Sequence, residues 1–254
     1  MKDAMCVIGA LKEEIFGIKA QMDIHETVSA GLGRAYYGRW FHHPVILVRS
    51  GVGRKLAKRA LEEVVSRFSI SEIVSIGFAG GLDPKLETGD LIIADSVRET
   101  HSETGIPSSE SLLPLDSHLL GQALRLSFRD KLTIKSGGLV TVDTPACSRE
   151  EKQKLYRCYS AIAVDMETSS LLRLAISKKI PFLSVRSISD SADQELVDFS
   201  HCFNEEGEIS RFKAGWHVLT NPSLLPKAET LRQASRFAAK NLTCYLKKWV
   251  SHSH

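Results

Sequence analysis

The chain has 254 residues, of which 43% are hydrophobic and 25% are charged. These values are close to the averages for soluble globular proteins, and they exclude a disulfide-stapled miniprotein, a disordered chain and a fibrous chain. With 33 Lys and Arg residues against 30 Asp and Glu residues, the net charge is only +3, so neither a nucleic acid nor an anionic membrane is the expected partner. Small-molecule chemistry is the expected function class.

The distribution of apolar residues and cysteines predicts a location and a redox state. No apolar run reaches the roughly 20 residues that a transmembrane helix needs, and the N-terminus enters a strand pattern without a signal peptide. We therefore expect a soluble, cytoplasmic protein with no transmembrane segment. The five cysteines form no CxxC pair, and the nine histidines do not cluster with carboxylates. Reduced thiols are expected, and no disulfide framework, metal centre or cofactor is implied.

Strand-like runs and helical patterns alternate along the chain, which is typical of an α/β layered domain. The first half is predicted to contain a strand over 4–8, a helix over 11–21, antiparallel strands over 34–40 and 45–49, a helix over 54–67, and strands over 72–78 and 90–97. After a mobile loop over 99–110, the second half is predicted to contain helices over 112–129, 150–159, 167–178 and 228–247 and strands over 138–142, 161–165 and 181–187. No linker-like stretch divides the chain, so we expect one domain over residues 1–254 with a C-terminal extension from about residue 197.

Three predicted strands end in glycine-containing turns: Gly9-Ala10, Ser50-Gly51-Val52-Gly53 and Gly77-Phe78-Ala79-Gly80-Gly81. Glycine allows positive φ and a close approach of backbone to ligand, and the carboxyl ends of strands in open α/β sheets are natural ligand sites. The second turn lacks the third glycine of a dinucleotide fingerprint, and no Gly-Lys-Ser/Thr or GxSxG motif occurs. These absences argue against a dinucleotide-dependent oxidoreductase, a P-loop NTPase and a serine hydrolase.

Acidic residues stand at or just after the ends of predicted strands. They are Glu13 or Glu14 after the first strand, Glu167, and Asp190 after Ser189. Because strand ends of an open α/β sheet converge on one crevice, these carboxylates are candidates for a common pocket. Two structural interpretations stay open. The helix macrodipole alone favours a Glu in the first turn of a helix, and Asp190 is also a suitable N-cap for a following helical turn.

Six motifs in series carry a resemblance to a known family. The sequence resembles the purine nucleoside phosphorylase and methylthioadenosine/S-adenosylhomocysteine nucleosidase superfamily, which implies a three-layer αβα sandwich with a central mixed twisted sheet, and a homodimer. Within it, Asp165 and the tail with Trp216 and Pro222 look most like the hopanoid-associated phosphorylase branch, with the methylthioadenosine-type nucleosidases close behind. The motifs are Ile8-Gly9-Ala10-Leu11-Lys12-Glu13-Glu14, Ser50-Gly51-Val52-Gly53, Gly77-Phe78-Ala79-Gly80-Gly81-Leu82, Thr88-Gly89-Asp90, Ala163-Val164-Asp165-Met166-Glu167 and Val185-Arg186-Ser187-Ile188-Ser189-Asp190.

The resemblance implies cleavage of the N-glycosidic bond of a purine nucleoside, with adenine as the expected base. Asp190 would protonate N7 of the purine, and Glu14 would orient or deprotonate the attacking water. Glu167 would hold the ribose hydroxyls, and Met166 would pack beneath the sugar. The other implied substrate-binding residues are Ser189, Phe78, Ala79, Gly80 and Val142. Such chemistry needs an acid for the leaving group and a nucleophile at the anomeric carbon.

Two departures from the family pattern bear on the reaction. Phe78 stands where such nucleosidases commonly have Ser or Thr, and residues 142–147 contain no aromatic, so Phe78 is interpreted either as a stacking surface or as core. Phosphorylases of the superfamily usually carry an Arg in the first glycine loop, where this chain has Glu13 and Glu14. A carboxylate repels phosphate, so hydrolysis is the preferred reaction. Arg54 is the candidate phosphate ligand, or part of a solvated basic helix face. A phosphate-dependent phosphorylase and a catalytically weak nucleoside-binding protein remain the alternatives.

Overall fold

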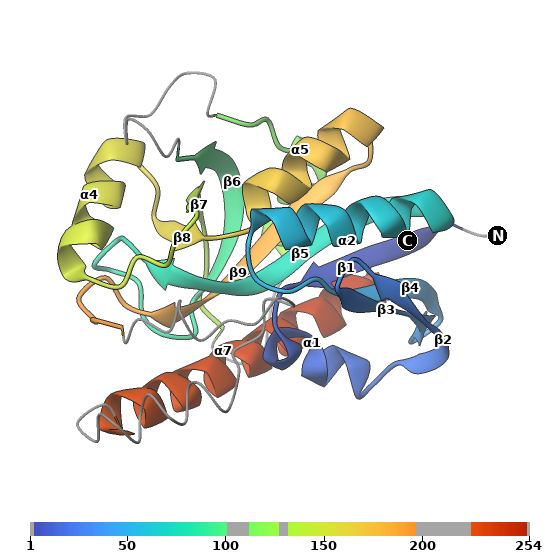
Figure 1. Cartoon of the computed structure of the whole chain (residues 1–254), viewed down its shortest axis with the longest axis horizontal. Coiled ribbons are helices and arrows are strands. Elements are labelled where there is room, and N and C mark those ends of the chain that lie inside the picture. Colours follow the sequence, from blue (N-terminus) through green and yellow to red (C-terminus); the bar gives the residue numbers. More distant parts are fainter. Residues whose placement is uncertain (1–2, 101–111, 127–131, 197–224, 253–254) are drawn as a thin grey trace.

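Nine strands form one mixed sheet in the computed structural model, which describes residues 3–100, 112–126, 132–196 and 225–252 (Figure 1). The strands are β1 (Ala4–Gly9), β2 (Asp23–Ala30), β3 (Gly33–Trp40), β4 (His43–Arg49), β5 (Ile70–Gly81), β6 (Leu91–Glu99), β7 (Ile134–Thr141), β8 (Ala163–Asp165) and β9 (Phe182–Asp190). Their order is β2-β3-β4-β1-β5-β8-β7-β6-β9, and β5 also pairs with β9. Strands β5, β8, β7, β6 and β9 therefore close into a ring.

Parallel strands in the middle of the sheet bring several strand ends to one edge. β1 pairs in parallel with β4 and β5, and β5 pairs in parallel with β9. The carboxyl ends of these four strands consequently lie on the same side. The outer hairpin β2-β3-β4 is antiparallel, as are the pairs β5–β8 and β6–β9. The glycine turns predicted from the sequence follow the ends of β1 and β4 and form the end of β5.

Helices cover both faces of this sheet. They are α1 (Lys12–Lys19), α2 (Arg54–Arg67), α3 (Ser117–Arg125), α4 (Arg149–Tyr159), α5 (Thr168–Lys178) and α7 (Leu225–His252). Helices α2 and α5 pack together on one face, and α1 and α7 pack together on the other (Figure 1). Leu61 and Leu171 belong to the core under the first pair, and Ile18 and Leu242 to the core under the second. The predicted three-layer αβα sandwich with a central mixed sheet is confirmed. The closed ring of five strands was not predicted from the sequence.

The elements predicted from the sequence need correction in two places. Strand β2 was not predicted, because its polar and mostly exposed side chains show no apolar alternation. The predicted helix over 112–129 is wrong at its start, since α3 begins at Ser117. Pro114 disfavours a helical Leu113, and the Leu113 N–H instead donates to the Val97 carbonyl at 2.9 Å. Asp116 then caps α3 by accepting from two backbone N–H groups.

Some predictions lie outside the described residues. These are residues 101–110 of the predicted mobile loop, and residues 197–224 of the predicted C-terminal extension, which include Trp216 and Pro222. One domain over residues 1–254 stays a prediction. Among the helices of the described ranges, none combines the length and the apolar character needed to cross a bilayer.

Candidate active site

Glu14 is buried at the start of α1, with 4% of its surface exposed. Its Oε2 accepts hydrogen bonds from the backbone N–H groups of Ala10 at 2.7 Å and Leu11 at 2.9 Å. Its Oε1 accepts from the N–H of Phe78 on β5 at 2.9 Å. A Cβ at Gly77 would lie 3.0 Å from Oε1, closer than ordinary van der Waals contact, so glycine leaves room for the carboxylate. Burial raises the pKa of the Glu14 carboxyl, while these N–H groups oppose the shift. The result is an oriented carboxylate between two glycine turns.

Glu167 directs its carboxylate towards the amino end of a different helix. It is the N-cap residue of α5 but makes no side-chain cap there. Its Oε1 accepts from the N–H of Gly53 at 2.7 Å, and Gly53 precedes α2 with a φ of +100°, which glycine adopts readily. Burial, together with the nearby charges of Asp165 and Glu14, raises the pKa of Glu167 to about 8. A purely local macrodipole interpretation therefore does not account for Glu167.

The raised pKa of Glu167 predicts a pH-dependent stability. The pKa of this carboxyl rises from 4.5 to about 8 on folding. Its contribution to the free energy of unfolding is therefore fully present below pH 4.5 and is lost as the pH rises to about 8. Gln at this position is neutral at every pH and keeps an oxygen for Gly53. We expect Glu167→Gln to melt within a degree or so of wild type near pH 4.5 and more than about 3 °C higher at pH 8. Thermal melts of both proteins across this range measure the difference, with exposed Glu150→Gln as control. Parallel melting curves for Glu167→Gln and wild type would contradict it.

A buried arginine lies beneath these carboxylates. Arg186 on β9 is 2% exposed, and its Nε and Nη2 donate to Asp165 Oδ2 at 3.0 and 2.9 Å. Nη2 also donates to the hydroxyls of Ser75 at 2.9 Å and Thr168 at 2.6 Å. The guanidinium charge favours the ionised forms of Glu14 and Glu167. Arg186 therefore supplies the positive charge that a cluster of buried carboxylates needs.

Asp190 is the last residue of β9 and is 2% exposed. Its carboxylate accepts hydrogen bonds from the side chains of Ser189 and Lys152, so its interpretation as the N-cap of a following helical turn is not supported. The pairing of β9 with β5 is irregular here, since Ile188 lies opposite Ala79 and Asp190 lies opposite Gly80. This bulge re-aims the end of the strand. A Cβ at Gly80 would lie 3.1 Å from Asp190 Oδ2, so glycine leaves room for the carboxylate.

Both oxygens of Asp190 have protein partners. Ser189 Oγ donates to Oδ1 at 2.6 Å, and Lys152 Nζ on α4 donates to Oδ2 at 2.6 Å. The side chains of Lys152 and Asp190 are 1% and 3% exposed, so this is a buried ion pair. Ser189 thus contacts the carboxylate of its neighbour Asp190, and Lys152 adds a cation that the sequence did not predict.

The remaining predicted substrate residues surround the same strand ends. Val142 is buried, and partly buried Met166 packs on its apolar cluster. Ala79 is buried in the core under α2 and α5, and partly buried Phe78 packs against the opposite core. Val142 also donates its N–H to the Asp165 carbonyl at 2.8 Å. These residues therefore belong to three different apolar clusters of the core. The packing of Phe78 agrees with its interpretation as core.

Arg54, the candidate phosphate ligand, is bound by two carboxylates. Its Nη1 contacts Glu99 Oε1 on β6, and its Nε donates to Asp143 Oδ1 at 2.8 Å. Glu99 also accepts from Arg173 on α5 at 2.7 Å. The Arg54 side chain is 15% exposed. These ion pairs connect α2 to the ends of β6 and β7 and occupy the guanidinium, so the solvated-face interpretation does not hold for Arg54.

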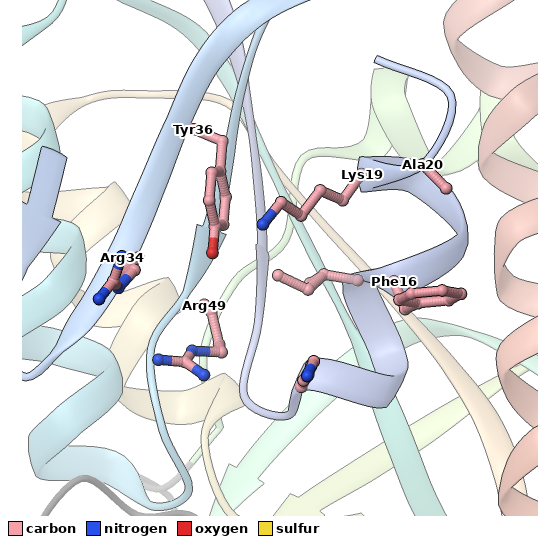
Figure 2. A pocket seen from close by; sticks show the side chains of 8 residues that line it. Phe16, Lys19, Ala20, Arg34, Tyr36 and Arg49 are labelled. Carbon is pink, nitrogen blue, oxygen red and sulfur yellow. The ribbon is translucent and has the colours of Figure 1, made fainter. Parts of the chain in front are cut away.

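A cavity of about 490 Å³ lies elsewhere, between α1 and strands β3 and β4 (Figure 2). Every charged side chain among its described lining residues is cationic: Lys12, Lys19, Arg34 and Arg49. Lys19 Nζ lies 3.9 Å from the centroid of the Tyr36 ring, a cation–π contact. Glu14, Glu167 and Asp190 are absent from these lining residues, so this cavity is separate from the carboxylate cluster.

Sequence reasoning named Glu14, Glu167 and Asp190 but gave no role to two buried cations, Arg186 and Lys152. Arg186 lies in the last of the six motifs, but the sequence did not predict a role for it. The sequence did contain an indication of its importance. Arg186 lies inside an apolar strand, and a buried arginine requires a carboxylate partner. Lys152 had no comparable signal, since its helix is rich in exposed charges. Only the packing of α4 against the end of β9 distinguishes it.

Comparisons with known proteins identify relatives of this chain. The family model described as the phosphorylase superfamily matches residues 4–211. A 5′-methylthioadenosine/S-adenosylhomocysteine nucleosidase of Tolumonas auensis is 29% identical over 201 residues, covering 74% of this chain and 86% of the relative. A protein of the same name from Staphylococcus aureus strain JH9 is 26% identical over 213 residues, covering 80% and 93%.

Solved structures share the fold. The nucleosidase of the same name from Neisseria meningitidis, in complex with methylthio-immucillin-A, has a TM-score of 0.78 at 21% identity, covering 99% of this chain and 100% of that chain. Futalosine hydrolase of Helicobacter pylori strain 26695 has a TM-score of 0.79 at 20% identity, covering 99% and 98%. The resemblance stated from the sequence motifs is confirmed.

Proposed function

The chain belongs to the phosphorylase superfamily, and from this membership and the site geometry we propose that it hydrolyses the N-glycosidic bond of an adenine nucleoside. The preferred substrates are 5′-methylthioadenosine and S-adenosylhomocysteine. The names of the two nucleosidase relatives support this substrate class. So does a Helicobacter pylori nucleosidase variant solved with 5′-methylthioadenosine in its active site, which shares the fold at a TM-score of 0.74.

Asp190 acts on the leaving group in the proposed reaction. Its proton moves to N7 of the purine as the bond between C1′ and N9 breaks, and the bonding electron pair stays with the base. The purine then departs neutral instead of as an anion, which lowers the barrier. Ser189 holds one carboxylate oxygen at 2.6 Å, so the acid group is oriented before substrate arrives.

Glu14 and Glu167 act on the sugar side. As the base leaves, C1′ develops oxocarbenium character, and nearby carboxylates stabilise that charge. Glu14 takes a proton from the water that attacks C1′, and its raised pKa makes it a better base than an ordinary carboxylate. Glu167, whose pKa is raised to about 8, exchanges hydrogen bonds with the ribose hydroxyls.

One observation favours hydrolysis over phosphorolysis. The Glu14 carboxylate already accepts the N–H groups of Ala10, Leu11 and Phe78, the donors that the two glycine turns offer to an anion. A phosphate at this position would face a carboxylate and would find those donors in use. Arg54 does not compensate, because Glu99 and Asp143 bind its guanidinium.

The proposal predicts adenine release that does not depend on phosphate. We expect equal rates, within about twofold, from methylthioadenosine with and without inorganic phosphate, and a free pentose as the sugar product. Adenine is followed by chromatography and the sugar by mass spectrometry. A pentose 1-phosphate formed only with phosphate would establish the alternative phosphorylase and overturn hydrolysis.

Two further predictions stay with this proposal. The hopanoid-type substrate, an adenosyl group with a long apolar 5′ substituent, is tested as a third nucleoside in the same assay. Tight adenine binding without turnover of any substrate would favour the nucleoside-binding protein.

The homodimer is tested by light scattering, where a monomer would contradict it.

A further inference from the structure

Lys152 is a buried lysine in the first turns of α4, which begins after the N-cap Ser148. It is 1% exposed. Its Nζ donates to Asp190 Oδ2 at 2.6 Å and to the carbonyls of Ser191 and Gln194 at 2.8 Å each. An ammonium carries three N–H donors, whereas a neutral amine carries two. Three acceptors around one Nζ therefore match the three donors of an ammonium, so Lys152 presents a cation to the Asp190 carboxylate.

The whole amino end of α4 holds the segment that follows β9. Arg149 Nη2 donates to the Asp193 carbonyl at 3.2 Å, and the N–H of Leu196 donates to the Cys147 carbonyl at 2.9 Å. Together with the two carbonyl contacts of Lys152, these bonds attach residues 191–196 to the helix. The position of Asp190 is thus set by a helix that is 38 residues away in sequence.

We propose that Lys152 is a positioning residue of this reaction: it orients Asp190 and stabilises the carboxylate that remains once Asp190 has given its proton to the purine. The inference rests on the proposed function. Asp190 takes up a proton from solvent water, transfers it to N7 as the C1′–N9 bond breaks, and returns to the ion pair. Lys152 keeps its three protons throughout and never touches the nucleoside.

The ion pair has opposing effects on the acid. An ammonium beside a carboxylic acid stabilises the ionised form, which favours transfer of the proton to N7 but disfavours the protonated acid that must form first. Among the described residues, the polar groups with contacts to the Asp190 carboxylate are Lys152 from α4 and Ser189 from β9, and from β5 only Gly80 approaches it. Asp193, the next acidic residue along the chain, is paired with Arg149 at 3.5 Å. Lys152 is therefore the cation that controls this balance.

The test is the pH dependence of kcat/KM for purine release by Lys152→Met, which keeps the length of the side chain and removes its charge. We expect the alkaline limb to move up by at least one pH unit and kcat at the optimum to fall at least about tenfold. Lys152→Arg should keep the limb within about half a unit of wild type, because the charge remains. Lys154→Met, on the exposed side of the same helix, is the matched control and should leave both readouts unchanged.

A merely structural lysine would give a different result. Loss of activity by the same factor at every pH, with the alkaline limb in place, would overturn the inference and leave the proposed hydrolase intact. If wild type releases no purine from any nucleoside, the proposed function fails, and the positioning role fails with it.

A stability cycle keeps the ion pair testable if Lys152→Met folds poorly or wild type is inactive. Urea unfolding midpoints are compared for wild type, Lys152→Met, Asp190→Asn and the double variant. We expect Lys152→Met to lower the midpoint clearly in the wild-type background and to raise it in the Asp190→Asn background, since the ammonium is then a buried charge without its carboxylate. Equal losses in both backgrounds would show that the pair does not form and would overturn the inference.

Discussion

Replacing Asp190 by Asn will strongly reduce purine release and will also weaken the fold. An amide cannot donate the proton that N7 requires, so kcat/KM should fall by roughly 10²–10⁴-fold. The same change removes the carboxylate from Lys152, whose side chain is 1% exposed. A buried ammonium without its partner costs about 3–5 kcal/mol. Steady-state kinetics and urea unfolding of the same preparation measure the two effects.

A double variant separates catalysis from stability. Asp190→Asn with Lys152→Met removes both buried charges, so we expect most of the lost stability to return while purine release stays strongly reduced. An Asp190→Asn protein with normal turnover would remove Asp190 from the mechanism. Recovery of activity in the double variant would show that the single change acted only through folding.

Replacing Glu14 by Gln is expected to have the second largest effect. The carboxylate accepts one N–H group on Oε1 and two on Oε2. A carboxamide has one oxygen, so in either orientation its NH₂ group faces a backbone N–H. The variant therefore loses both the base and part of its orientation, and we expect kcat to fall at least about 10²-fold. KM for the nucleoside should change much less, because Glu14 acts on water.

The neighbouring glutamate provides a matched control. Glu13 is exposed, so Glu13→Gln carries the same chemical change outside the site and should leave kcat unchanged. Burial raises the pKa of Glu14, and activity should therefore decline as the pH falls through that pKa in wild type. Glu14→Gln should lack this acid limb. A Glu14→Gln enzyme that keeps the wild-type rate would exclude Glu14 as the base.

Periodicity and turn chemistry were sufficient for much of the fold. The runs over 4–8 and 45–49 are continuous and apolar, as strands buried on both faces must be, and each became a strand within two residues of its prediction. The helix over 54–67 matched α2 because its apolar stripe recurs at helical spacing. Where apolar periodicity was missing, in the exposed edge strand β2, the prediction failed. At α3 the helical pattern was followed too far, and the local effects of Pro114 and Asp116 were overlooked.

The sequence by itself determined the order of the elements, the glycine turns at the strand ends and the three acidic candidates, because each of these is encoded by neighbouring residues. The motif resemblance selected Glu14, and only the tertiary structure showed what holds its carboxylate, including an N–H of Phe78 that lies 64 positions away. The tertiary structure also placed Lys152 on Asp190 and tied Arg54 to Asp143, pairs separated by 38 and 89 positions. Local propensity does not encode such pairs. Burial imposes them, since a charge removed from water must find its partner wherever the packed sheet and helices bring one.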